Sequence, residues 1–314
     1  VALLDDDDIW LPHRLRVQVP VLEAKLSVGV VYGHGYVDGD RFSNAIWPDE
    51  RWGLSGSVFE EFLVQETEHD LFNIDTVLVR REAFDKAGYF DQSLKTMEHH
   101  DMMLRLAFHY PFEFVRGPVS RGRLSKNGQF LTSIADGTYE QCYRRVIEKG
   151  LAMLPDTTAS AELRRKARKA VFVIVAELHW RYSFPKRLRS HLLNTLKEHP
   201  WMLEEKPMLK YLRRLVEIEA VGADTPAIAI RELLSEVKCA ADVAGLRMRW
   251  RLHQIIADLL VEAGIVLIKK GSFRSSEMFF LSSLFRDPTR LCFRLFKIVL
   301  RRLCHGIQVF HVKR

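Results

Sequence analysis

The sequence predicts an α/β domain followed by an all-α helical domain. Over residues 1–150, short β-branched runs alternate with helix-like segments, and residues 151–314 show helical periodicity almost throughout. The net charge also changes sign, because the first part carries 17 Lys and Arg against 24 Asp and Glu and the second carries 30 against 16. We therefore expect two domains with different partners, although helical surfaces that use Lys and Arg for solubility would give the same balance.

Composition excludes several classes of protein. The chain has 314 residues, of which 47% are hydrophobic and 28% charged, so it can bury a sizeable core and is not intrinsically disordered. No stretch reaches the ~18 apolar residues that a membrane-spanning helix needs. The cysteines lie far apart without a CxxC pair, which predicts reduced thiols of a cytoplasmic protein and no structural zinc site. They are Cys142, Cys239, Cys292 and Cys304.

The elements of the first domain follow from periodicity and residue type. Runs rich in β-branched residues predict strands at 28–37, 76–79 and 112–119. Helical spacing predicts helices at 58–65, 81–88 and 98–110. Gly88 is a suitable C-terminal stop for the second of these helices.

The second domain repeats an apolar pattern at an offset of 88 residues. Residues 192–215 correspond to residues 280–303, and each copy has an apolar helix, a proline and a second helix. This pattern resembles helical hairpins of the tetratricopeptide kind, with a plain helical bundle as the alternative. Residues 289–314 contain no acidic residue and form a basic amphipathic stripe. It predicts either peripheral contact with an anionic membrane, on the inner face of the plasma membrane, or an ordinary packed helix.

Four consecutive carboxylates follow the first apolar run. Residues 1–4 predict a buried strand, and Asp5 to Asp8 come directly after it, where ligands bind in open α/β sheets. Adjacent carboxylates repel one another unless a cation neutralises them, and hard oxygen ligands suit Mg²⁺ or Mn²⁺. A solvated acidic loop is the alternative. Because the run begins at Val1, we expect that the natural chain starts further upstream.

The flanking residues resemble family 2 glycosyltransferases of GT-A fold, whose string is roughly LD-x-DD-x-W-x-P-xx-L-xx-Q. The matching residues are Leu4, Asp5, Asp7, Asp8, Trp10, Pro12, Leu15 and Gln18. The resemblance implies that residues 1–150 are the later part of a GT-A domain. It also implies that Asp5 and Asp7 bind a divalent metal and that Asp5 and Asp8 contact the nucleotide-sugar donor.

Two further segments match the same family. The first, residues 77–94, carries an Arg-Arg-x-x-Phe and a Gly-x-Phe-Asp pattern that we expect to be largely scaffold near the sugar and acceptor. The second, residues 97–107, corresponds to the helix of the general base, with His99 where relatives place an aspartate. The base is then Glu98, His99 or Asp101, although Asp101 and Arg105 are spaced to form a simple ion pair.

A weaker match covers residues 121–127. Arg121, Arg123 and Lys126 are placed to neutralise a diphosphate, or they belong to a solvated loop. Together the matches imply a metal-dependent, inverting transfer of a sugar from a nucleotide-diphospho-sugar to a hydroxyl of a glycan or lipid-linked acceptor.

Other functional classes stay open. The helical half would serve as an interaction scaffold if the transferase part were inert. Nucleic-acid binding has little support, because no basic patch interleaved with aromatic residues is present. A two-metal nuclease would need further acidic ligands on other strands.

Overall fold

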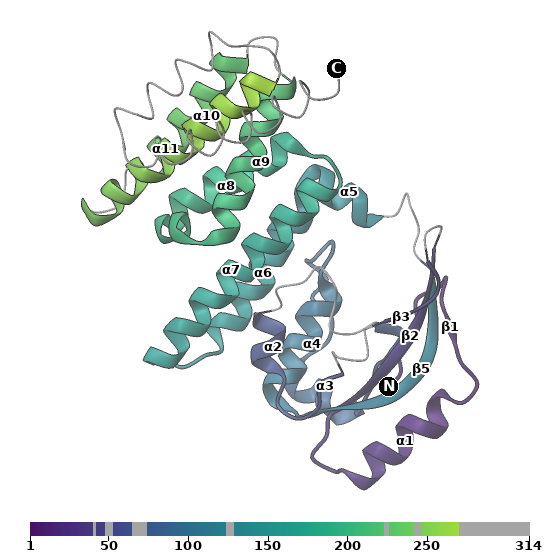
Figure 1. Ribbon diagram of the computed structural model, residues 1–314. Coiled ribbons are helices and arrows are strands. Elements are labelled where there is room, and N and C mark those ends of the chain that lie inside the picture. The colour runs from purple at the N-terminus through teal and green to yellow at the C-terminus, as the bar shows by residue number, and fades with distance from the viewer. Residues whose placement is uncertain are drawn as a thin grey trace, which may run out of the picture. The chain divides into compact units, whose positions relative to one another are not determined.

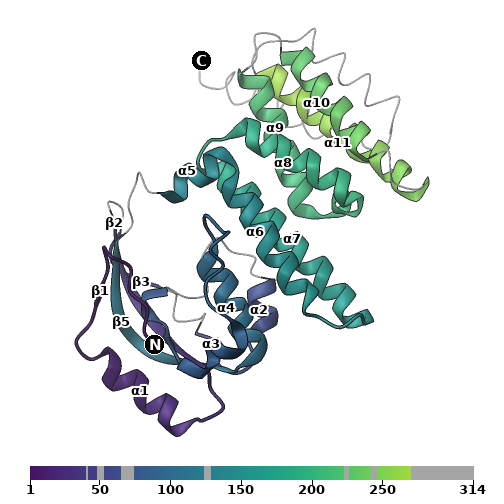
Figure 2. The same cartoon turned by 180° about the vertical axis from the view of Figure 1, so that it is seen from behind.

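The computed structural model describes residues 1–39, 42–47, 53–64, 74–123, 129–222, 226–241 and 246–269 (Figures 1 and 2). The chain divides into two compact units, Val1–Tyr182 and Ser183 onward. The first is α/β and the described part of the second is helical, so the predicted class is confirmed at this level.

The division between the units lies later than the expected residue 150. That position falls inside helix α6 (Thr138–Ala152), which belongs to the first unit together with α7 (Thr158–Arg181). Both helices contact α2 (Phe59–Leu63), and α6 also contacts α4 (Glu98–His109). Helical periodicity alone does not distinguish these helices from those of the second unit.

A mixed five-stranded sheet forms the centre of the first unit. Its order is β1 (Ile9–Trp10), β5 (Phe112–Arg123), β2 (Val30–Gly39) and β3 (Phe42–Trp47), and β4 (Leu78–Val79) also pairs with β2. Strands β2 and β5 are parallel, whereas the other pairs are antiparallel. The start of β2 is wholly buried, which explains its β-branched run.

The sequence located most of these strands but not all. The strands expected at 28–37 and 112–119 are found as β2 and β5, and the one at 76–79 shortens to β4 after a 3₁₀ turn, η2 (Ile74–Thr76). The expected buried strand at 1–4 is instead an isolated bridge between Ala2 and Leu78, and Val1 and Leu4 are 45% and 50% exposed. The short β1 and the edge strand β3 were not predicted.

Helices cover both faces of this sheet. Helix α1 (Arg14–Ala24) lies on one face, and α2, α3 (Arg81–Ala87) and α4 lie on the other (Figure 1). Helix α3 ends at Gly88, whose φ of 79° is readily adopted by glycine, as predicted. The short α5 (Gln129–Asp136) packs on α6 and α7.

The second unit consists of helices in its described part. They are α8 (Pro185–Glu198), the 3₁₀ helix η3 (Pro200–Glu204), α9 (Lys206–Gly222), α10 (Pro226–Ala241) and α11 (Leu246–Lys269). Each α-helix contacts the next one and the next but one. The second copy of the expected repeat and the basic segment 289–314 lie outside the described residues. Among the helices that the structure describes, none has the length and apolarity to cross a membrane.

Candidate functional site

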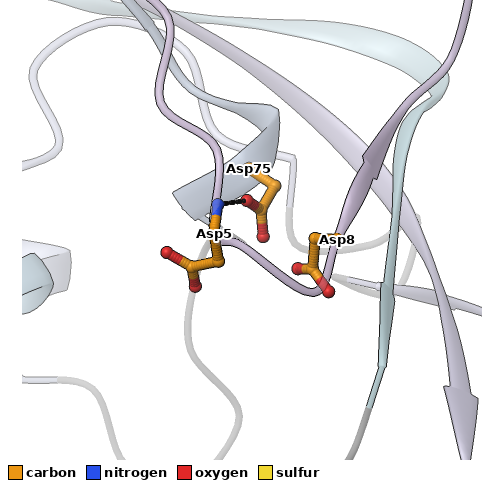
Figure 3. A group of neighbouring side chains, drawn as sticks. All are labelled: Asp5, Asp8 and Asp75. Atoms are coloured by element: carbon orange, nitrogen blue, oxygen red, sulfur yellow. Dashed lines mark hydrogen bonds between the residues drawn. The ribbon is translucent and has the colours of Figure 1, made fainter.

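Three carboxylates from two distant segments meet at one end of the first apolar run. Asp5, Asp8 and Asp75 each offer an oxygen within 4.8 Å of the others (Figure 3). The Asp8 N–H donates to the Asp5 carbonyl at 3.3 Å, which closes a tight turn. The Asp5 N–H donates to Oδ1 of Asp75 at 2.7 Å, so this turn is fastened to η2.

The group brings an exposed, a half-buried and a buried carboxylate close together. Burial, reinforced by a hydrogen bond with the Asp8 side chain, raises the pKa of Asp75 to about 8. Burial is also the main cause that raises the pKa of Asp5, and the charges of Asp8, Asp7 and Glu98 add to it. A bound cation would lower both pKa values, because it favours the ionised carboxylates.

Helix α1 fixes the two segments that carry these carboxylates. Arg14 is 1% exposed, and its guanidinium donates to the carbonyls of Val77 at 2.8 Å and Leu3 at 3.3 Å. Gln18 is fully buried, accepts a hydrogen bond from Arg14 and donates to the Thr76 carbonyl at 2.6 Å. The matching glutamine of the first motif is therefore part of the support and not of the ligand set.

The first turn of α4 carries two of the expected base candidates. Nε2 of His99 is 3.7 Å from Oε1 of Glu98, and both side chains are about one-third exposed. The charge of His99 lowers the pKa of Asp5 and that of Glu98 raises it, so both lie within electrostatic reach of Asp5. The aspartate turn and the expected base helix, which are far apart in the sequence, thus lie close enough for their charges to interact.

The third base candidate is placed differently. Asp101 is 1% exposed, and its carboxylate is paired with Arg105 at 2.8 Å and with Lys149. The expected i,i+4 pair therefore exists, with a buried carboxylate and a half-buried guanidinium. A buried carboxylate whose oxygens are engaged by two cations is poorly placed to meet an acceptor hydroxyl. His100, the second histidine of the pair, is also buried, and its Nε2 is 3.2 Å from the Phe62 carbonyl.

The segment 77–94 makes structural contacts, as expected for most of it. The Arg80 guanidinium donates to the Leu22 carbonyl at 2.6 Å and to the Val28 carbonyl at 3.1 Å, which holds the end of α1. Asp91 accepts hydrogen bonds from Ser93, and together with the nearby Lys149 these lower the pKa of Asp91.

The other expected ligands were Asp7, Arg121 and Arg123. Asp7 is exposed and is not a member of the carboxylate group, so the expected Asp5–Asp7 pair gives way to Asp5, Asp8 and Asp75. Arg121 lies opposite Ile9 in β5, with its guanidinium 4.8 Å from the centroid of the Tyr36 ring. The side chain of Arg123, like the whole of Lys126, lies outside the described residues.

Sequence reasoning missed Asp75. This residue stands in the apolar run 74–79, where a single charged side chain interrupts five residues suited to a strand. A carboxylate inside such a run is unusual, because burying it is costly unless it has a partner. That signal was present, but the partner segment was not evident from the sequence.

Comparison with known proteins gives no assignment. No family model matches the sequence, and no curated protein matches it. The chemistry of the site therefore carries the functional interpretation.

Proposed function

We propose that the protein is a metal-dependent glycosyltransferase, which moves a sugar from a nucleotide-diphospho-sugar to an acceptor hydroxyl. The observation that supports this proposal is the meeting of Asp5, Asp8 and Asp75, with Glu98 and His99 within electrostatic reach of Asp5. The proposal also draws on the resemblance of the first segment to family 2 glycosyltransferases.

The carboxylate group is chemically suited to a divalent ion. Mg²⁺ and Mn²⁺ prefer hard oxygen ligands, and the ligand oxygens of one such ion are about 3–4 Å apart. The observed upper spacing of 4.8 Å lies close to this range, so small side-chain rotations suffice. Asp5, Asp8 and Asp75 would hold the ion, which when bound would neutralise the charge on the departing diphosphate.

The neighbouring side chains would handle the proton of the acceptor. His99 and Glu98 are about one-third exposed, so an acceptor hydroxyl can reach either of them. One of them would take the proton as the oxygen attacks the sugar, and the other would orient it through the contact at 3.7 Å. A positioned general base contributes about 10²–10⁴ in rate.

Metal-dependent binding of a nucleoside diphosphate tests the proposal. We expect the full chain to bind a labelled nucleoside diphosphate in the presence of Mn²⁺ and to release it when the metal is chelated. Asp8→Asn should abolish this binding. Asp6→Asn, an exposed neighbour in the same turn, should leave it unchanged. Binding that persists after chelation, or equal loss in both variants, would contradict the proposal.

A second comparison identifies the base. Of Glu98→Gln and His99→Ala, the variant that removes the base should lose turnover and keep its affinity for the donor. A scaffold would bind no nucleotide in these assays, and a nuclease would instead cleave nucleic acid in a Mn²⁺-dependent reaction.

A further inference from the structure

An ion-pair network joins three segments of the first unit. Lys149 of α6 lies between two carboxylates, with Nζ 3.0 Å from Asp91 and also paired with Asp101 of α4. Asp101 in turn binds Arg105, which donates to the carbonyl of Tyr89 at 2.8 Å. Helix α6, helix α4 and the loop after α3 are therefore tied together by charged side chains.

The same network reaches the first turn of α4. The Asp101 N–H donates to the Met97 carbonyl at 3.0 Å, which closes the turn that contains Glu98 and His99. Met97 has a φ of 67°, a left-handed conformation that is unfavourable for a residue with a side chain. Such a conformation persists where the surrounding structure holds it, and the hydrogen bond from the Asp101 N–H is one contact made at this turn.

The loop after α3 contacts the expected base from the other side. It carries Phe90, whose ring lies edge-to-face with the His99 ring at a centroid distance of 5.7 Å. The same loop carries Asp91, which Lys149 binds. The imidazole is thus held between its own helix and a loop, and Lys149 contacts a carboxylate in each.

We propose that Lys149 is a positioning residue for Glu98 and His99. By joining Asp91 and Asp101 it holds the loop and the first turn of α4 in a fixed relative position, so that His99 packs on Phe90. That Glu98 or His99 acts as a base rests on the proposed function. The effect on position does not, because it follows from contacts within the chain.

Replacing Lys149 should displace Glu98 and His99 without leaving a cavity in the core. Lys149→Met keeps much of the apolar stem and leaves Arg105 to pair with Asp101. Asp91 loses its 3.0 Å contact with Nζ and keeps only the longer 3.6 Å contact with Arg145 of α6. A misplacement of about 1 Å at a reacting group can cost about 10² in rate. We therefore expect kcat to fall about 10- to 100-fold with KM changed less than about threefold, and Lys149→Arg to restore kcat.

The test reads the position of His99 directly. In protein with labelled Phe and His rings, the nuclear Overhauser effect between Phe90 and His99 should be strong in the wild type and lost in Lys149→Met. It should persist in Lys149→Arg and in the control Arg144→Met, which removes an ion pair with Glu140 within α6. An unchanged ring-to-ring signal in folded Lys149→Met would overturn the proposal.

Two additions keep the outcome decisive. If Lys149→Met does not fold, Asp91→Asn removes the loop half of the network and should weaken the same signal; an unchanged signal there overturns the proposal equally. Mn²⁺ added to the wild type should broaden the His99 ring signals. An absence of broadening would count against the proposed metal site, and the metal-free ring-to-ring signal would still decide the role of Lys149.

Discussion

Asp75→Asn is the substitution that most sharply separates the stability of the acidic group from its chemistry. Asparagine keeps a side-chain oxygen that can accept the hydrogen bond from the Asp5 N–H, and its amide can donate toward Asp8 as the protonated acid would. It cannot ionise. The variant therefore resembles the protonated form of Asp75 at every pH.

The pKa of Asp75 sets the direction and the size of the effect. The unfolded chain loses this proton near pH 3.8, whereas the folded protein keeps it until about pH 8. Between these values the folded state binds more protons, so the free energy of unfolding falls as the pH rises. One pKa unit corresponds to about 1.4 kcal/mol, which gives an upper limit of about 6 kcal/mol above pH 8. Because Asp5 and Asp8 are partly solvated, we expect about 2–4 kcal/mol.

The assay compares wild type and Asp75→Asn at several pH values without metal. Because the chain has two units, unfolding of the first in urea is followed by hydrogen exchange of β2 peptides. Near pH 4 the free energy of unfolding should be the same for the variant and the wild type. As the pH rises to 8, the variant should become steadily more stable than the wild type. Asp7→Asn, which changes an exposed carboxylate of the same turn, should show no such trend. A stability difference for Asp75→Asn that is constant with pH, or that shrinks as the pH rises, would refute the reasoning.

Three further predictions concern the support and the ionisation of the site. Arg14→Met should lower the free energy of unfolding by about 2–4 kcal/mol, because the carbonyls of Leu3 and Val77 lose the hydrogen bonds that the buried guanidinium donates. Arg16→Met, which changes an exposed residue of the same helix, should change it by less than about 0.5 kcal/mol. Urea unfolding measures both values. Burial lowers the pKa of His100 to about 4, so between pH 6.5 and 4 the unfolded chain binds a proton that the folded protein does not. Over this range the free energy of unfolding of the wild type should fall by up to about 3 kcal/mol relative to that of His100→Gln. Mn²⁺ affinity, measured by calorimetry, should rise up to about tenfold per pH unit between pH 6 and 8, because Asp75 must release its proton to bind the ion.

The alternation of strands and helices could be predicted from the sequence, because most of these elements follow from the residue types within them. The central strand β2 begins fully buried and carries the β-branched pair Val30 and Val31 there. Helix α3 stops at Gly88 because its left-handed conformation suits glycine. In contrast, β1 has two residues and owes its assignment to pairing with β5, which no local pattern predicts.

The site was predictable in its chemistry and less so in its membership. The acidic run marked the place, and residues 97–101 marked the neighbouring helix. However, within a run of four aspartates only the fold decides which side chains meet another segment, and the turn directs Asp5 and Asp8 toward Asp75. Asp101 was indistinguishable from a base candidate in sequence, because its cation Lys149 lies 48 residues away.

The most direct test of the central claim is the Mn²⁺ affinity of four proteins, measured by electron paramagnetic resonance at pH 8. Wild type and Asp7→Asn should bind one ion with similar affinity. Asp8→Asn and Asp75→Asn should bind it at least about tenfold more weakly, because each lacks one of the three carboxylates. Equal affinity in all four proteins, or a loss confined to Asp7→Asn, would contradict the account.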